Sequence, residues 1–141
     1  MTKRFAGTIA LALVIGFAAG CGGEDEESEE AAGGACGAAP AQMAQPPTLP
    51  NGFPTPEGVV YTSEREAGPS HIVEGFRDGE LEDAFEAYKD AFEEAGYDVT
   101  KDEREEDDAE VNFAGGASTG QVRLEQRCEE RTSIDITARP E

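Results

Sequence analysis

Residues 78–96 of the chain read DGELEDAFEAYKDAFEEAG, and this stretch decides the fold because it is the strongest helical segment. Its apolar side chains recur at intervals of three and four residues and share one helix face: Leu81, Ala84, Phe85, Tyr88, Phe92 and Ala95. The opposite face is almost entirely acidic. We expect Asp78 or Gly79 to be the N-cap and Gly96 to follow the last turn.

Segments with period-two alternation lie on both sides of this helix and predict β-strands. Two precede the helix, at residues 59–66 and 70–77, and four follow it, at residues 97–101, 109–113, 121–128 and 132–138. The apolar positions of the last three strands are expected to face the helix: Val111, Phe113, Val122, Leu124, Ile134 and Ile136. The expected connections are a turn at 67–69, a charged turn at 102–108, a glycine-rich hairpin loop at 114–120 and a tight turn at 129–131.

An antiparallel sheet with one apolar face needs a second layer that covers this face. The segments therefore predict an α+β domain, an antiparallel sheet of about six strands covered on one face by a single amphipathic helix, in the order β-β-α-β-β-β-β. We place this small acidic domain at residues 48–141. Prolines between residues 46 and 56 keep its entry segment extended.

Residues 21–47 are expected to form a disordered tether in front of the domain. Six carboxylates fall within residues 24–30, and residues 31–47 are uncharged and rich in Gly, Ala, Pro and Gln. Such a composition buries too little apolar surface to fold, and like charges extend the chain. A cation-binding acidic tail is the functional alternative for the acidic run.

The first 20 residues have the pattern of an export signal. Lys3 and Arg4 precede an uncharged apolar run from Phe5 to about Ala19. This run is short for a membrane span, which needs about 20 apolar residues, and fits the hydrophobic region of a signal peptide. We therefore expect residues 1–20 to be removed on export.

Small residues, Ala18, Ala19 and Gly20, stand directly before Cys21, and here the chain resembles the bacterial lipoprotein precursors. The resemblance covers residues 1–21 only. It implies cleavage between Gly20 and Cys21 and diacylglyceryl attachment to the Cys21 sulfur, often with acylation of the new amino group. Two or three acyl chains on one residue make a lasting membrane anchor. An ordinary signal peptide cut near Ala18 and an uncleaved anchor are the alternatives.

The resemblance also implies a location and leaves two cysteines to be assigned. The protein would be exported and held in the outer leaflet of the plasma membrane, or in the outer membrane if the cell has two, because Gly22 stands where the family's inner-membrane retention signal has aspartate. Cys36 and Cys128 would then lie in an oxidising compartment, where they either form a disulfide or remain free thiols. A zinc site is not expected with two cysteines and one histidine.

The net charge of −20 limits the classes of partner. Because Lys3 and Arg4 are the only charged residues before Cys21, the chain from Cys21 onward has nine basic and 31 acidic residues. Nucleic acids and anionic lipid surfaces both attract cationic side chains. The composition therefore argues against nucleic acid as a partner and favours a basic or cationic one.

The sequence offers no visible catalytic constellation. His71, the only histidine, lies beside Ile72 and Val73 in a predicted strand and is expected to be an ordinary strand residue. The glycines of residues 115–120 suit a hairpin, because Gln121 follows where a phosphate-binding loop needs lysine. Paired carboxylates are too numerous for any one pair to indicate acid/base catalysis.

Residues 102–110, DEREEDDAE, are the strongest remaining candidate for a ligand site. Calcium takes six to eight oxygen ligands, and the weak candidates here are Asp102, Glu103, Glu105, Glu106, Asp107 and Asp108. Their spacing departs from an EF-hand loop, which needs a glycine at the sharp turn. We therefore expect a solvated turn and assign no firm metal site and no cofactor.

The functional expectation is a membrane-anchored cell-envelope lipoprotein whose small acidic domain is a binding or interaction module and not an enzyme. Its expected partners are the membrane, through the lipid on Cys21, and a protein, a cell-wall polymer or another envelope component. An acidic structural or divalent-cation-binding surface protein is the alternative. An envelope hydrolase is the third class.

Overall fold

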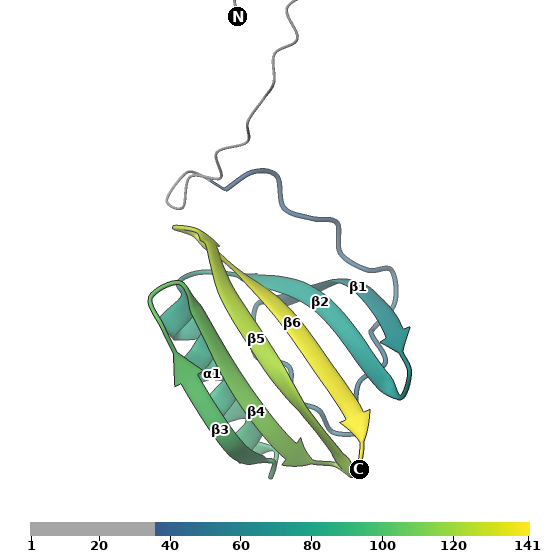
Figure 1. Ribbon diagram of the computed structural model, residues 1–141. Helices are drawn as coiled ribbons and strands as arrows, with labels where there is room; N and C mark the ends of the chain where they lie inside the picture. Colours follow the sequence, from purple (N-terminus) through teal and green to yellow (C-terminus); the bar gives the residue numbers. More distant parts are fainter. Residues whose placement is uncertain (1–35) are drawn as a thin grey trace, which may run out of the picture.

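The computed structural model describes residues 36–141, which form a six-stranded antiparallel sheet and one helix (Figure 1). The elements, in chain order, are β1 Val59–Ala67, β2 Ser70–Asp78, α1 Leu81–Glu94, β3 Asp98–Arg104, β4 Asp108–Gly115, β5 Ser118–Cys128 and β6 Arg131–Pro140. The prediction of a mixed α and β domain, with an antiparallel sheet of about six strands and a single helix, is confirmed.

The strand order across the sheet is β1-β2-β6-β5-β4-β3, and every neighbouring pair is antiparallel. Short turns join β3 to β4, β4 to β5 and β5 to β6, whereas α1 carries the chain from β2 to β3 at the far edge. The last strand returns to pair with β2. Two segments that are far apart in the sequence, β2 and β6, therefore lie side by side in the middle of the sheet.

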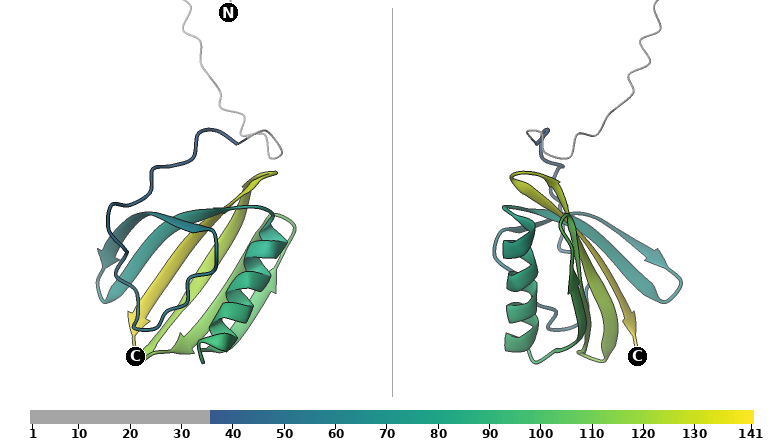
Figure 2. Two further views of the ribbon diagram at one scale, coloured as in Figure 1. Left: turned by 180° about the vertical axis from the view of Figure 1, so that it is seen from behind. Right: turned by 60° about the vertical axis from the view of Figure 1, so that its left-hand side comes forward.

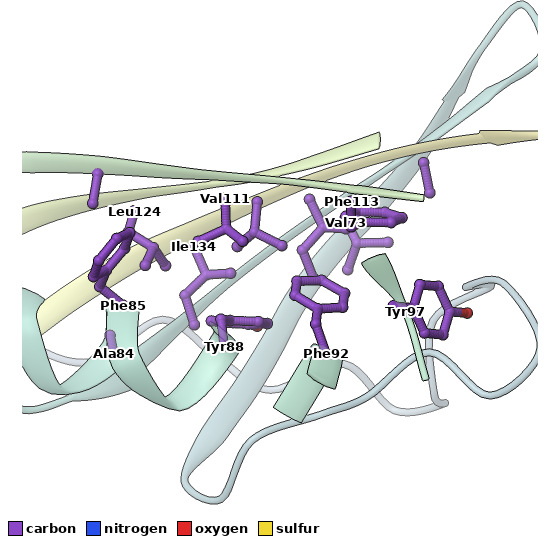
Figure 3. Close-up of a cluster of buried hydrophobic side chains, with 14 of the residues drawn as sticks. Val73, Ala84, Phe85, Tyr88, Phe92, Tyr97, Val111, Phe113, Leu124 and Ile134 are labelled. Carbon is purple, nitrogen blue, oxygen red and sulfur yellow. The ribbon is translucent and has the colours of Figure 1, made fainter. Parts of the chain in front are cut away.

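Helix α1 lies on one face of the sheet, and within residues 36–141 the other face has no helix (Figure 2). Its buried side chains are Leu81, Ala84, Phe85, Tyr88 and Phe92. They pack against strand side chains that are also buried, including all six that the alternation predicts: Val111, Phe113, Val122, Leu124, Ile134 and Ile136 (Figure 3). The prediction for Ala95 was wrong, because α1 ends at Glu94 and Ala95 is an exposed C-cap.

The expectation that a single helix covers this face also needs correction. The chain before β1 lies beside α1 on the same side of the sheet, over β1 and β2 (Figure 2), and its residues Leu49 and Phe53 pack against the core. The Phe53 ring centroid is 5.4 Å from that of Phe92 and 5.3 Å from that of Phe113. The proline-rich entry segment therefore forms part of the covering layer.

Residues 36–47, which the sequence assigns to the tether, contact the sheet. Cys36 forms a disulfide with Cys128 at the end of β5. The backbone N–H of Met43 donates a hydrogen bond to the carbonyl oxygen of Tyr61 in β1 at 2.8 Å. The Arg131 guanidinium also donates to the carbonyl oxygen of Gly37, so the part of the predicted tether that the structure describes is attached to the domain at several points.

The start of α1 differs from the predicted cap. Its N-cap is Glu80, whose side chain makes no capping hydrogen bond. Instead, the backbone N–H of Leu81 donates to Oε1 of Gln126 in β5 at 2.5 Å. Gly79 has a φ of 121°, which a residue with a Cβ rarely adopts, and this conformation turns the chain from β2 into the helix.

Two predicted connections are shorter than expected because the strands extend into them. The charged turn contains only residues 105–107, since β3 ends at Arg104 and β4 begins at Asp108. The glycine-rich loop is a hairpin, as expected, but only Gly116 and Ala117 lie between its strands, with φ of 60° and 58°. Two positive φ angles in sequence are the geometry of a tight type I′ turn.

Candidate functional site

The sheet face opposite α1 is largely polar, and Figure 1 views the sheet from this side. We call it the open face and define it by the strand side chains that alternate with the buried core residues. They include Ser63, Arg65, Ser70, Ile72, Glu74, Lys101, Glu103, Glu110, Asn112, Thr119, Gln121, Arg123, Asp135 and Thr137. Alternation follows from the pleat of a strand, which points successive side chains to opposite faces.

Strand register arranges the open face in rows that run across the strands. One row, which we call the charged row, contains Ser63, Glu74, Asp135, Arg123, Glu110 and Glu103. The neighbouring row, which we call the amide row, contains Arg65, Ile72, Thr137, Gln121, Asn112 and Lys101. Each row takes one residue from each of the six strands, so residues from distant parts of the chain become neighbours.

A shallow hollow of about 370 Å³ extends across the amide row, from β2 to β3. Its polar lining consists of the hydroxyl residues Ser70, Thr100, Thr119 and Thr137, the amide residues Asn112 and Gln121, and Arg139. None of the lining residues is a carboxylate. The hollow therefore presents hydroxyl, amide and guanidinium groups, and the carboxylate of Glu110, which accepts from Nδ2 of Asn112 at 2.6 Å, lies beside its lining.

A second hollow of about 370 Å³ lies over the charged row, and its lining includes three carboxylates, those of Glu74, Glu125 and Asp135. Glu74 and Asp135 are directly opposite each other in the pairing of β2 with β6. The Ser63 hydroxyl donates to Oε2 of Glu74 at 2.6 Å. Burial, and then the charge of Glu74, raise the pKa of Asp135, while Arg65 and Arg123 act in the opposite direction. Asp135 is therefore the group in this row that holds a proton more readily than a free aspartate does.

The raised pKa of Asp135 predicts a pH-dependent effect on stability. The unfolded chain loses this proton near the ordinary value of 3.8, before the folded chain does, so ionisation of Asp135 lowers stability as the pH rises above 3.8. Asp135→Asn is expected to be slightly more stable than the wild type at neutral pH. Below pH 3.8 the difference should disappear. Urea unfolding at a series of pH values measures it.

The control for this prediction is Glu86→Gln, which removes one negative charge from the exposed surface of α1. It shows how much stability the chain gains when any one negative charge is removed, which is then compared with the gain from removing the charge of Asp135. If Glu86→Gln gains as much stability with the same pH profile, the local environment of Asp135 is not the cause.

The predicted lipid-attachment and cleavage residues, Cys21 and Gly20, lie outside the described residues. Cys36 and Cys128 are brought together, with 5.5 Å between their Cα atoms, and form the disulfide that was one of two alternatives. Cys128 is buried and Cys36 is partly so. The disulfide joins the beginning of the described chain to the end of β5.

The acidic residues of 102–108 are not brought together as a cation site. Asp102 accepts from the Lys89 ammonium of α1 at 3.0 Å, on the helix side, whereas Glu103 pairs with Lys101 at 2.9 Å on the open face. Asp102 and Glu103 point to opposite faces because they are successive residues of β3. Within residues 36–141, no group of three Cys, His, Asp or Glu side chains is placed to hold a metal.

The one histidine of the chain occupies a strand position. His71 lies in β2, is half-buried, and has Nδ1 3.8 Å from Oε1 of Glu66 on the neighbouring strand. Its register partner in β6 is Ala138, which supplies no functional group. The arrangement around His71 therefore contains no nucleophile and base pair of the kind that a triad needs.

The outer surface of α1 differs from the open face in its charge. Its exposed residues are Glu82, Asp83, Glu86, Asp90, Glu93 and Glu94, and its only basic residue, Lys89, is paired with Asp102. The two sides of the domain thus present different chemistry to a partner. In residues 36–141 the helix lacks the length and apolar character that crossing a membrane requires.

Sequence reasoning missed the open face as a site. The signal was present in the polar positions of residues 118–126 and 132–139, which are Thr, Gln, Arg, Ser and Asp alternating with core residues. Polar residues at those positions are expected on any solvated strand face, so they did not indicate a site. Only the strand register showed that they lie next to one another in rows. Comparison of the chain with protein-family models, with curated proteins and with solved structures found no match.

Proposed function

We propose that the protein is a lipid-anchored binding module of the cell envelope and that its open face is the surface that meets the ligand. The single observation that carries the binding role is the open face itself. No helix of residues 36–141 covers this face, and its rows of hydroxyl, amide and guanidinium groups offer many directional hydrogen bonds on a rigid scaffold. Because the strands already fix the backbone, binding has to order only the side chains.

The anchor part of the proposal rests on the N-terminal sequence. Residues 18–21 read AAGC at the end of an uncharged apolar run. Lipid on Cys21 would hold the domain at the membrane, and the carboxylates of residues 24–30 would keep it away from anionic headgroups. Anchoring also raises the local concentration of the domain near envelope material, which makes weak binding by the open face effective.

A photo-crosslinking experiment in living cells tests both parts. A photo-reactive amino acid replaces Arg123 on the open face in one chain and Glu86 on the outer surface of α1 in another. The chain with the reactive group at position 123 is expected to be in the membrane fraction and to crosslink to envelope material. The same chain carrying Cys21→Ser is expected to leave the membrane fraction, because the thiol that accepts the lipid is gone.

Two comparisons keep the test specific. Cys36→Ser should remain in the membrane fraction, because Cys36 is the disulfide cysteine and not the lipid-bearing one. A reactive group at position 86 should give few crosslinks. The proposal is overturned if Cys21→Ser stays membrane-bound, or if position 86 crosslinks as well as position 123.

A hydrolase is the second candidate function, and one observation favours it. Glu74 and Asp135 face each other, and burial and the charge of Glu74 raise the pKa of Asp135. A carboxyl group with a raised pKa beside a second carboxylate is an arrangement that acid/base catalysis uses. Turnover of an envelope polymer that Asp135→Asn abolishes, with binding retained, would favour this candidate over simple binding.

A further inference from the structure

The hollow over the amide row contains a guanidinium group that is available to a ligand. Arg139 is exposed, and it belongs to none of the ion pairs found among residues 36–141. Its Nε donates a 3.4 Å hydrogen bond to the hydroxyl of Thr119. Four N–H bonds of the guanidinium remain, in a planar arrangement that matches the two oxygens of a carboxylate.

The rest of the hollow matches a ligand with many hydroxyl groups. Thr137, Gln121 and Asn112 are half-buried neighbours on β6, β5 and β4, and each can both donate and accept hydrogen bonds. Nδ2 of Asn112 already donates to Oε1 of Glu110 at 2.6 Å, which leaves its second N–H and its carbonyl oxygen for a ligand. A sugar hydroxyl also donates and accepts. The strands lie about 4.8 Å apart, which is close to the length of one sugar ring, so an extended glycan lying across them meets a polar side chain on each strand.

We propose that this hollow binds an extended acidic glycan whose uronate carboxylate is held by Arg139 and whose ring hydroxyls bond to Thr137, Gln121 and Asn112. The inference rests on the proposed function, because it names the ligand class of the open face. Charge complementarity supports it: the lining has one guanidinium and no carboxylate. Glu74, Asp135 and Glu110 of the charged row lie on the opposite side of the amide row from Arg139, so the ligand's carboxylate is expected at Arg139 and not toward that row.

The probe is trigalacturonate, and its methyl ester is the matched control ligand. The two share one sugar backbone, but the ester has no negative charge. Isothermal titration of the full lipid-anchored chain in detergent micelles, at physiological salt, measures both affinities. We expect saturable but weak binding of trigalacturonate, because no exposed aromatic ring lines the hollow for stacking, and clearly weaker binding of the ester.

Three variants locate the binding. Arg139→Gln is expected to weaken trigalacturonate binding about tenfold, the usual loss when a hydrogen-bonded charge is removed, and to leave the ester unchanged. Gln121→Glu places a carboxylate in the hollow and should weaken the binding of trigalacturonate more than the binding of its methyl ester. Arg104→Gln is the matched control, because Arg104 pairs with Glu82 of α1, away from the open face.

Equal affinity for the acid and its ester, or an effect of Arg104→Gln as large as that of Arg139→Gln, overturns the inference. Absence of binding by trigalacturonate overturns it as well. In that case crosslinking from position 123 decides separately whether the open face binds something else, for example a protein, so the proposed function can survive. A melting curve for each variant shows whether it is folded. If Arg139→Gln does not fold, the effect of Gln121→Glu on trigalacturonate binding tests the inference in its place.

Discussion

Reduction of the Cys36–Cys128 disulfide is expected to lower the free energy of unfolding by about 2–4 kcal/mol. The two cysteines are 92 residues apart in the chain, so the bond closes a loop that includes most of the domain. A crosslink over such a long loop removes much of the conformational freedom of the unfolded chain. Urea unfolding with and without dithiothreitol measures the effect.

The experiment is done in a Cys21→Ser background, which leaves Cys36 and Cys128 as the two remaining cysteines. Cys36→Ser in this background should reproduce the loss that dithiothreitol causes, and dithiothreitol should have no further effect on it. Cys36 is the better position to substitute, because Cys128 is buried and its loss would also disturb packing. Equal stability of the oxidised and reduced chains would contradict the prediction.

Loss of the disulfide should first release the chain around Cys36. The Arg131 guanidinium donates a hydrogen bond to the carbonyl oxygen of Gly37 at 3.1 Å, and Met43 and Thr48 bond to β1 further along. These are single hydrogen bonds at or near the surface, each of which stabilises by only about 1 kcal/mol. The disulfide is therefore the strongest attachment of residues 36–48 to the sheet.

Phe92→Ala is expected to destabilise the domain by about 3–5 kcal/mol. The Phe92 side chain is fully buried, and its ring centroid lies 4.8 Å from that of Phe113 and 5.7 Å from that of Tyr97. Figure 3 shows Phe92 pointing from α1 into the cluster that faces the sheet. Removal of the ring leaves a cavity where the helix, the sheet and the entry segment meet. Thermal or urea unfolding measures the loss.

Glu93→Ala is the matched control, because Glu93 is the next residue of α1 and is exposed. Its expected effect is within about 0.5 kcal/mol, as for most surface substitutions. Near-equal effects of the two substitutions would mean that the Phe92 ring is not packed as described. Because a small domain is only marginally stable, Phe92→Ala is measured at low temperature, where a folded population remains.

The core and the open face have separate roles in the proposed function. Phe92 and the disulfide hold the scaffold together, and neither contributes a group to the hollow that Arg139 lines. Substitutions of Arg139 and Gln121 should therefore change binding with little change in stability. Substitution of Phe92 should reduce binding only to the extent that it reduces the folded population.

Residue pattern alone was enough to predict the antiparallel strands, the single helix and the buried face of each, but not the part of the covering layer that the entry segment forms. The spacing of Leu81, Phe85, Tyr88 and Phe92 selected one helix face, and the alternation in the last three strands selected the core side of the sheet. Such patterns succeed because burial of apolar groups acts on each element separately. The helix start was not predictable in this way, since Leu81 bonds to Gln126, 45 residues further along the chain.

What the sequence by itself determined is therefore local: the elements, and which side chains of each element are apolar. What only the tertiary structure decided is which elements are neighbours. The return of β6 to β2 sets Glu74 against Asp135 and forms both rows of the open face, and the fold brings Cys36 to Cys128. The physical reason is that a period-two pattern assigns a side chain to a face of the sheet, but only hydrogen-bonded register assigns its partners across the strands.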